Sequence, residues 1–182
     1  MNIELKPIEQ QVVVVMGASS GIGRATALEF ARRGARVMVS ARSQEGLDSL
    51  VEQIRYAGGQ AEAVVADVTD FEDVQNVARR AAATFGRIDT WVHAAAVAIY
   101  ANFEQMTPDE FMQVIDVNLL GQVHGAMAAL PYLRQVGRGA LIHISSVESK
   151  RALPYHSAYA ASKHGIAGFV DALRLELMHE SV

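Results

Sequence analysis

The sequence contains no cysteine, and it has only four prolines and one tryptophan in 182 residues. Without cysteine the chain can form neither a disulfide nor a thiolate metal site, and this fits a reducing compartment. Its apolar runs are as long as strands and much shorter than a membrane span. The net charge is −4 and no large lysine or arginine cluster is present, which argues against nucleic-acid binding. Residues 1–11 do not resemble a signal peptide. We therefore expect a cytoplasmic protein without a metal site.

What is present is an ordinary globular composition, with 51% hydrophobic and 20% charged residues. The length suits one domain covering residues 1–182. A β-branched run at 12–16 ends in a Gly/Ser turn, which is typical of a buried parallel strand. Strand and helix signals then alternate. We expect strands at 12–16, 36–41, 61–66, 88–94 and 140–144, and helices at 21–33, 43–57, 70–85, 107–135 and 157–179.

Repeated βα units of this length predict an α/β fold, a Rossmann-like doubly wound parallel sheet with helices on both faces. The helix at 107–135 has a clear start, because Thr107 can cap it, Pro108 suits its first position and Glu110 completes a capping box. The chain stops just after a helix, where such a fold normally places another strand. We expect a domain truncated before its last two strands, and the alternative is a sheet that ends naturally with five.

The first candidate site is the glycine-rich turn between the first strand and the first helix. Its glycines let the backbone approach a diphosphate, and the helix N-terminus offers free amides and a partial positive charge. The spacing is Gly-x-x-x-Gly-x-Gly, and the alternative is a tight turn without a ligand. The residues expected to contact a dinucleotide here are Gly17, Ser19, Ser20, Gly21, Ile22 and Gly23.

The ends of the second and third strands bear on which dinucleotide is bound. Folds that prefer NAD place an acid after the second strand to hold the ribose 2′-hydroxyl, whereas an arginine there suits a 2′-phosphate. The sequence has Arg42 and no acid, which favours NADP(H) over NAD(H), although Arg42 could simply be a solvated helix-entry residue. Asp67 and Val68 follow the third strand on the edge where such folds bind ligands, and both are expected to contact the dinucleotide. Asp67 could accept a hydrogen bond from adenine, or it could cap the next helix.

Tyr159 and Lys163 are four residues apart in a predicted helix, so their side chains share one face. A phenol normally loses its proton near pH 10, and a cation beside it stabilises the phenolate. At about 5 Å and an effective dielectric of roughly 20, the attraction is about 3 kcal/mol. The pair therefore suits general acid–base chemistry near neutral pH. Such a pair also occurs by chance on helix surfaces.

Two further polar positions are candidates. Ser145 and Ser146 follow the fifth strand on the same edge as the glycine turn, where a hydroxyl could stabilise charge on a substrate oxygen. Serine is also common in turns. Asn118 lies in the middle of the 107–135 helix, an unfavourable place for asparagine. It marks a kink or a water site, or else a surface position.

Together these motifs resemble those of the short-chain dehydrogenase/reductase family, in the family's order and over nearly the whole chain. The resemblance implies that Tyr159 is the general acid for carbonyl reduction or the base for alcohol oxidation, and that Lys163 assists it. It implies that both residues contact the cofactor, Lys163 through the nicotinamide ribose. It implies that Ser146, thirteen residues before Tyr159, steadies the substrate oxygen. It further implies that Asn118 holds a water of the proton relay and that Ala95 contacts the cofactor.

The sequence also departs from the family pattern. Met16 stands where the family usually has threonine, and residues 93–96 read His-Ala-Ala-Ala in place of Asn-Asn-Ala-Gly. Ala94 cannot brace neighbouring strands as asparagine does, and Ala96 adds a methyl group near the cofactor. His143 replaces an asparagine that often precedes the serines. These departures leave the proton-transfer residues unchanged.

The sequence thus predicts an oxidoreductase that transfers a hydride between NADP(H) and a carbonyl or secondary alcohol substrate. The alternative is a non-catalytic NAD(P)-binding sensor or scaffold, and epimerisation or dehydration ranks below both. The resemblance implies a homodimer or homotetramer formed through the outer faces of the last two helices, unless their apolar residues are all core. Glu148, Tyr155 and His156 lie near the expected pocket mouth, where they contact substrate or are merely solvated.

Overall fold

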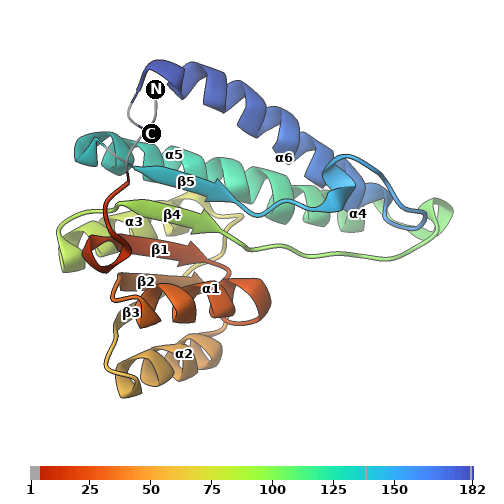
Figure 1. The fold of residues 1–182 in the computed structure, drawn as a ribbon. Helices are drawn as coiled ribbons and strands as arrows, with labels where there is room; N and C mark the ends of the chain where they lie inside the picture. The colour runs from red at the N-terminus through yellow and green to blue at the C-terminus, as the bar shows by residue number, and fades with distance from the viewer. Residues whose placement is uncertain (1–4, 138, 181) are drawn as a thin grey trace.

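A parallel sheet lies at the centre of the computed structural model, which describes residues 5–137, 139–180 and 182 (Figure 1). The strands run in the order β3-β2-β1-β4-β5. The chain moves outward from β1 to β3 and then returns to β4 on the other side of β1. The carboxyl ends of β1 and β4 therefore flank a switch point, where such sheets bind ligands. The strands are β1 (Val12–Met16), β2 (Arg36–Ala41), β3 (Gln60–Val65), β4 (Thr90–His93) and β5 (Ala140–His143).

Helices cover both faces of the sheet, which confirms the predicted doubly wound fold (Figure 1). The described residues form the α-helices α1 (Gly21–Arg32), α2 (Gln44–Tyr56), α3 (Phe71–Phe85), α4 (Pro108–Ile115), α5 (Gly121–Val136) and α6 (Ser157–Glu176). Short 3-10 turns are η1 (Ile8–Gln10), η2 (Phe103–Gln105), η4 (Val147–Ser149) and η5 (Leu177–His179). None of the helices within the described ranges is long and apolar enough to cross a bilayer.

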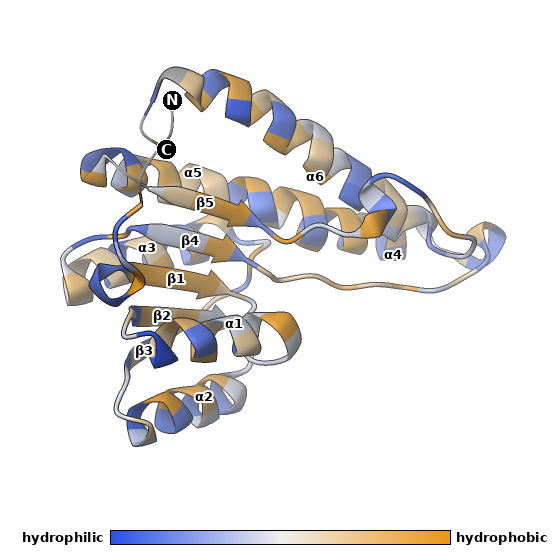
Figure 2. Cartoon of the chain, viewed as in Figure 1, coloured by the Kyte–Doolittle hydropathy of each residue, from blue (hydrophilic) through white to orange (hydrophobic). Residues whose placement is uncertain are grey.

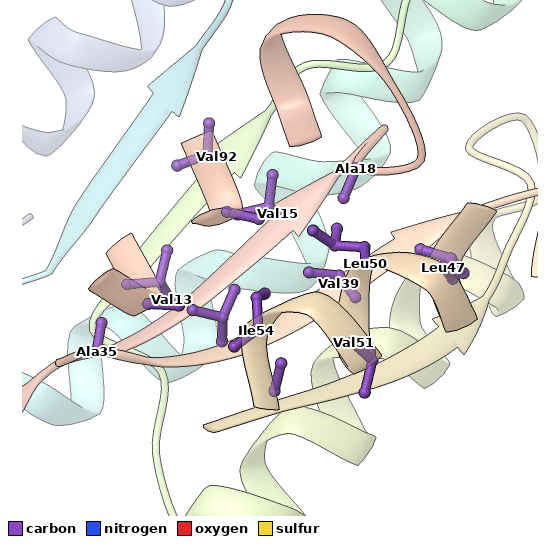
Figure 3. Packing of buried hydrophobic residues seen from close by; sticks show 14 of the residues in the cluster. Val13, Val15, Ala18, Ala35, Val39, Leu47, Leu50, Val51, Ile54 and Val92 are labelled. Carbon is purple, nitrogen blue, oxygen red and sulfur yellow. The ribbon is translucent and has the colours of Figure 1, made fainter. Parts of the chain in front are cut away.

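The core has two halves because successive side chains of β1 point to opposite faces. Val13 and Val15 face a cluster formed with α1 and α2, part of which is drawn in Figure 3. Val14 and Met16 face a second cluster, formed with α3 and α5. All residues of β1 are fully buried, and Figure 2 shows β1 as a hydrophobic strand, whereas polar and apolar residues alternate along the helices. This burial on both sides explains the unbroken valine run.

The helix expected at 107–135 is interrupted, so its prediction as one continuous α-helix was wrong. The predicted capping box at its start is present, with Thr107 and Glu110 bonded reciprocally. Residues Asp116–Leu120 form a π-helical turn, η3, between α4 and α5. The amide of Gly121 donates to the carbonyl of Asp116, five residues earlier. Such a turn inserts an extra residue and is frequent at functional sites.

Candidate active site

The glycine turn after β1 brings the backbone very close to the segment after β4. Gly17 has a φ of +78°, and the amides of Gly17 and Ala18 both donate to the Ser40 carbonyl at 2.8 and 3.0 Å. A Cβ on Gly17 would lie 2.5 Å from the backbone nitrogen of Ala95, and one on Gly23 would overlap the Gly17 carbonyl. Glycine is therefore required at both positions, and the turn leads directly into the N-terminus of α1.

A cavity of about 410 Å³ opens over this turn, at the carboxyl ends of β1 to β4. It brings together ten of the twelve residues predicted to bind the cofactor: Gly17, Ser19, Ser20, Gly21, Ile22, Gly23, Arg42, Asp67, Val68 and Ala95. Tyr159 and Lys163 are not among its lining residues. Ala94 and Ala96, the departures from the family motif, also line it. The close backbone approach and the helix N-terminus suit a bound diphosphate.

Arg42 and Asp67 both line this cavity and lie next to each other. The guanidinium of Arg42 lies 3.8 Å from the second carboxylate oxygen of Asp67, and its side chain is 66% exposed. It is therefore a cation held loosely at the end of β2 and free to meet an anionic ligand. Within the described residues, no cluster of three or more histidines and acids is arranged to hold a metal ion.

Asp67 does not cap the helix that follows it, so the capping alternative was wrong. Asp70 caps α3, accepting from the amides of Glu72 and Asp73. Asp67 instead accepts from the amide and hydroxyl of Thr69 at 2.9 and 2.8 Å. Burial alone would raise the pKa of Asp67, but the bonds from Thr69 and the charge of Arg42 together lower it below its usual value. The carboxylate is therefore ionised at neutral pH.

Helix α6 begins at the same edge of the sheet (Figure 1), and Tyr159 and Lys163 lie in its first two turns. The Lys163 nitrogen lies 5.4 Å from the centre of the Tyr159 ring and donates to the carbonyl of Ile144 at 3.1 Å. Lys163 is only 1% exposed, and this burial lowers its pKa. The spacing of Tyr159 and Lys163 thus brings their side chains into contact, as the sequence predicted. Ile144 lies just after β5, so the carbonyl joins α6 to the end of that strand.

Asn118 is fully buried in the π turn, so the alternative of a surface position was wrong. Its side-chain oxygen accepts from the amide of Val97 at 2.8 Å, and its nitrogen donates to the carbonyl of the same residue at 2.8 Å. The nitrogen also donates to the hydroxyl of Ser162 at 3.1 Å, and that hydroxyl donates to the carbonyl of Tyr159 at 2.7 Å. Asn118 therefore fastens the segment after β4 to the first turns of α6.

Ser146 precedes the 3-10 turn η4, which packs against α6. The hydroxyl oxygen of Ser146 accepts from the amide of Glu148 at 3.2 Å and so begins η4. Glu148 is 5% exposed and pairs with His156 at 2.8 Å, so its solvated alternative was wrong. The ring of His156 stands edge-on to that of Tyr159, with centroids 6.4 Å apart. Tyr155 is 60% exposed and has a φ of +66°.

Sequence reasoning missed two polar residues of this network, Ser162 and Gln122. Both are fully buried. Gln122 follows Asn118 by four residues and so lies on the same helical face. A polar residue repeated at that spacing on a core-facing stripe was the available signal. Ser162 lies between Tyr159 and Lys163 and closes a local bond to its own helix, a pattern that sequence alone does not separate from simple exposure.

Two histidines, the fully buried His93 and the partly buried His143, lie side by side at the carboxyl ends of β4 and β5. His93 and His143 are partners in the β4–β5 register. Burial, together with the nearby charges of His143, Lys163 and His124, lowers the pKa of His93 to about 3. Burial lowers the pKa of His143 to about 4. Both rings are therefore neutral at physiological pH.

Comparison with known proteins agrees with this geometry. The family model described as short chain dehydrogenase matches residues 11–182. The chain belongs to the short-chain dehydrogenase family. Members of this oxidoreductase family bind NAD(P) and act on small molecules.

Similar proteins include the uncharacterized oxidoreductase YxnA of Bacillus subtilis, 38% identical over 98% of this chain and 51% of that protein. The 3-oxoacyl-[acyl-carrier-protein] reductase FabG of Thermotoga maritima is 34% identical over 96% of this chain and 71% of that protein. A solved actinorhodin polyketide ketoreductase with NADPH has a TM-score of 0.91 and 28% identity, covering 98% of this chain and 69% of the other. The chain thus spans about half the length of YxnA.

Replacing Gly17 by alanine should destabilise the protein more than the same change at Gly58. Both glycines have positive φ, but a Cβ on Gly58 meets nothing within 4 Å. Gly58→Ala should cost about 1–2 kcal/mol from its backbone conformation. Gly17→Ala should cost at least about 1 kcal/mol more, because the methyl group overlaps Ala95. Urea unfolding measures both, and equal costs would contradict the described turn.

The free energy of unfolding should fall in acid, because His93 is protonated more readily in the unfolded chain than in the folded protein. Its folded pKa of about 3 lies below the unfolded value of 6.5. The unfolded chain therefore binds the proton first, and the stabilisation present above pH 6.5 is lost as the pH falls toward 3. Unfolding free energies measured between pH 7 and 4 should decline more steeply in the wild type than in His93→Asn, by up to about 1.4 kcal/mol per pH unit. Parallel curves would show that this ring is protonated in the native state.

Proposed function

We propose that this chain is the catalytic part of an NADP(H)-dependent oxidoreductase that interconverts a carbonyl and a secondary alcohol. The observation that carries the proposal is the Tyr159–Lys163 pair, held by Ile144 at the sheet edge where the glycine-turn cavity opens. The fit of the cofactor is supported by the turn itself, which leaves no room for a Cβ at Gly17 or Gly23. Bound NADP(H) would supply or accept the hydride.

The chain's own residues would handle binding and the proton. The amides at the start of α1 would hold the diphosphate, and Asp67 with Val68 would meet the adenine. Tyr159 would give its hydroxyl proton to the carbonyl oxygen in reduction and take it back in oxidation. The ammonium of Lys163 would stabilise the phenolate formed. Ser146 would donate to the same substrate oxygen.

The substrate class follows from the reaction and is supported by the relatives. The chain resembles proteins named as a ketoacyl reductase and a polyketide ketoreductase, whose substrates carry a ketone. The preference for NADP(H) is supported by Arg42, the exposed cation at the end of β2, and by the similar ketoreductase, which was solved with NADPH. Assembly into a homodimer or homotetramer is supported by exposed apolar side chains on the later helices, among them Met112, Met127, Leu175 and Met178.

Tyr159→Phe should reduce kcat for ketone reduction by about 10²–10⁴-fold, because the proton donor is lost. The assay follows NADPH absorbance at 340 nm with a panel of ketones. The dissociation constant for NADPH should change little, since the ring remains. Tyr56→Phe is the control, because Tyr56 is 97% exposed on α2. Unchanged turnover in Tyr159→Phe would refute the proposed chemistry. Tight NADPH binding without activity in the wild type would favour the sensor alternative.

Arg42→Ala should weaken NADPH binding much more than NADH binding. The variant lacks the guanidinium that would donate a charge-assisted hydrogen bond to the 2′-phosphate of NADPH. The ratio of the NADPH and NADH dissociation constants should therefore shift by about tenfold or more. Fluorescence titration with each cofactor measures this ratio. Arg80→Ala, at an exposed position of α3 outside the cavity, should leave it unchanged. An unaltered ratio in Arg42→Ala would remove the basis for NADP(H) preference.

A further inference from the structure

The carbonyl oxygen of Ile144 accepts two hydrogen bonds from two different helices. Lys163 of α6 donates to it at 3.1 Å, and the side-chain amide of Gln122 of α5 donates to it at 3.2 Å. A backbone carbonyl has two lone pairs, so these donors occupy both. The Lys163 ammonium therefore meets this oxygen from one direction only, because Gln122 holds the other.

Gln122 is itself held in one orientation. It is fully buried within α5, and its side-chain oxygen lies 2.8 Å from Nδ1 of His143. The Ile144 oxygen can only accept, so the NH₂ group of Gln122 must face it, and the Gln122 oxygen must face His143. That oxygen also only accepts, so Nδ1 of His143 must carry a proton.

The proton on Nδ1 is the single proton of the His143 ring. Burial lowers the pKa of His143 to about 4, so the ring is neutral at physiological pH. Its Nε2 is therefore an unprotonated acceptor, and in the described part of the chain it is buried without a hydrogen-bond partner. A tautomer with the proton on Nε2 would leave two acceptors facing each other at 2.8 Å. The contact thus fixes the tautomer of His143.

We propose that Gln122, oriented by His143, is a positioning residue. It fixes the position of the Lys163 ammonium through the Ile144 carbonyl, to which both side chains donate. This inference rests on the proposed function, since it concerns how the Lys163 ammonium is oriented toward Tyr159 and the cofactor. The ammonium has three donors, and one is fixed on Ile144. The direction of that bond decides where the other two point. Without Gln122, the carbonyl would offer a second lone pair and the ammonium could shift to it.

A structural alternative is that Gln122 merely fastens α5 to β5. Two titratable groups near Lys163 are Tyr159 on its own helix and the neutral His93 on β4. A fastening role would affect stability alone. A positioning role would also affect kcat and cofactor affinity, which the following variants separate.

Histidine tautomers can be read without any enzymatic assay. Two-bond ¹⁵N–¹H correlation spectra of the ¹⁵N-labelled protein at pH 7, assigned with His143→Asn, should show His143 with its proton on Nδ1. A proton on Nε2 would overturn the proposed orientation of Gln122.

Gln122→Met removes both bonds while keeping a side chain of similar size. The matched control is Gln11→Met, because Gln11 is also buried and makes two bonds, to Lys6 at 2.6 Å and from Thr90 at 2.8 Å, at the opposite end of the sheet. Both variants should lose stability. Only Gln122→Met should lower kcat by about tenfold and weaken NADPH binding. Equal kcat and equal binding in the two variants would reduce Gln122 to a structural fastener and overturn the proposal.

A second pair of variants keeps the test decisive if Gln122→Met does not fold. The amide of asparagine can replace Nδ1–H as a donor, so His143→Asn should retain kcat within about twofold, whereas His143→Phe should behave like Gln122→Met. Equal kcat in the Asn and Phe variants would overturn the proposal.

Lys163→Met separates this inference from the proposed function. If Lys163→Met remains active, the proposed function fails. If it is inactive while Gln122→Met matches Gln11→Met, only the positioning role fails.

Discussion

The peptide group of Ile144 is the point on which the rest of the site depends. Its amide donates to the carbonyl of His93 on β4 at 3.0 Å, and its carbonyl accepts from Lys163 and Gln122. One residue thus joins two strands and two helices. A buried ammonium is costly unless it is hydrogen-bonded. The Ile144 carbonyl therefore stabilises Lys163 in a place where solvent does not, and it keeps α6 against the end of the sheet.

The surroundings of this peptide group are more polar than an ordinary core. Asn118, Gln122, Ser162, Lys163 and His93 are all at most 1% exposed. Asn118 and Ser162 continue the network from Val97 to the Tyr159 carbonyl. The π turn gives Asn118 its place, since the extra residue displaces the helix at this point. Apolar contacts of α3 and α5 with β1 form the second half of the core, which supports this group of polar residues.

The sequence was most informative where chemistry is local. The valine run and the Gly17–Gly23 turn predicted β1, α1 and the cavity between them, because strand burial and close backbone approach restrict residue type directly. The spacing of Tyr159 and Lys163 predicted their contact, because helical geometry fixes it.

Long-range pairings could not be obtained in this way. Asn118 bonds Val97 and Ser162, and Gln122 bonds Ile144 and His143, across 21 to 44 residues of sequence as the chain folds back. Asn118 in the helix interior pointed to a kink as one alternative, but the sequence did not specify a π turn. Asp67 could not be separated from a helix cap, since Asp70, three residues later, offers the same chemistry.

The most direct test is a crystal structure of the protein with bound NADP⁺. We predict that the diphosphate lies over the Gly17–Gly23 turn and that the nicotinamide ribose lies beside Lys163. The Lys163 nitrogen should stay within about 3.2 Å of the Ile144 oxygen while its other donors meet the ribose. A dinucleotide bound outside this cavity, or a Lys163 side chain released from Ile144, would contradict it.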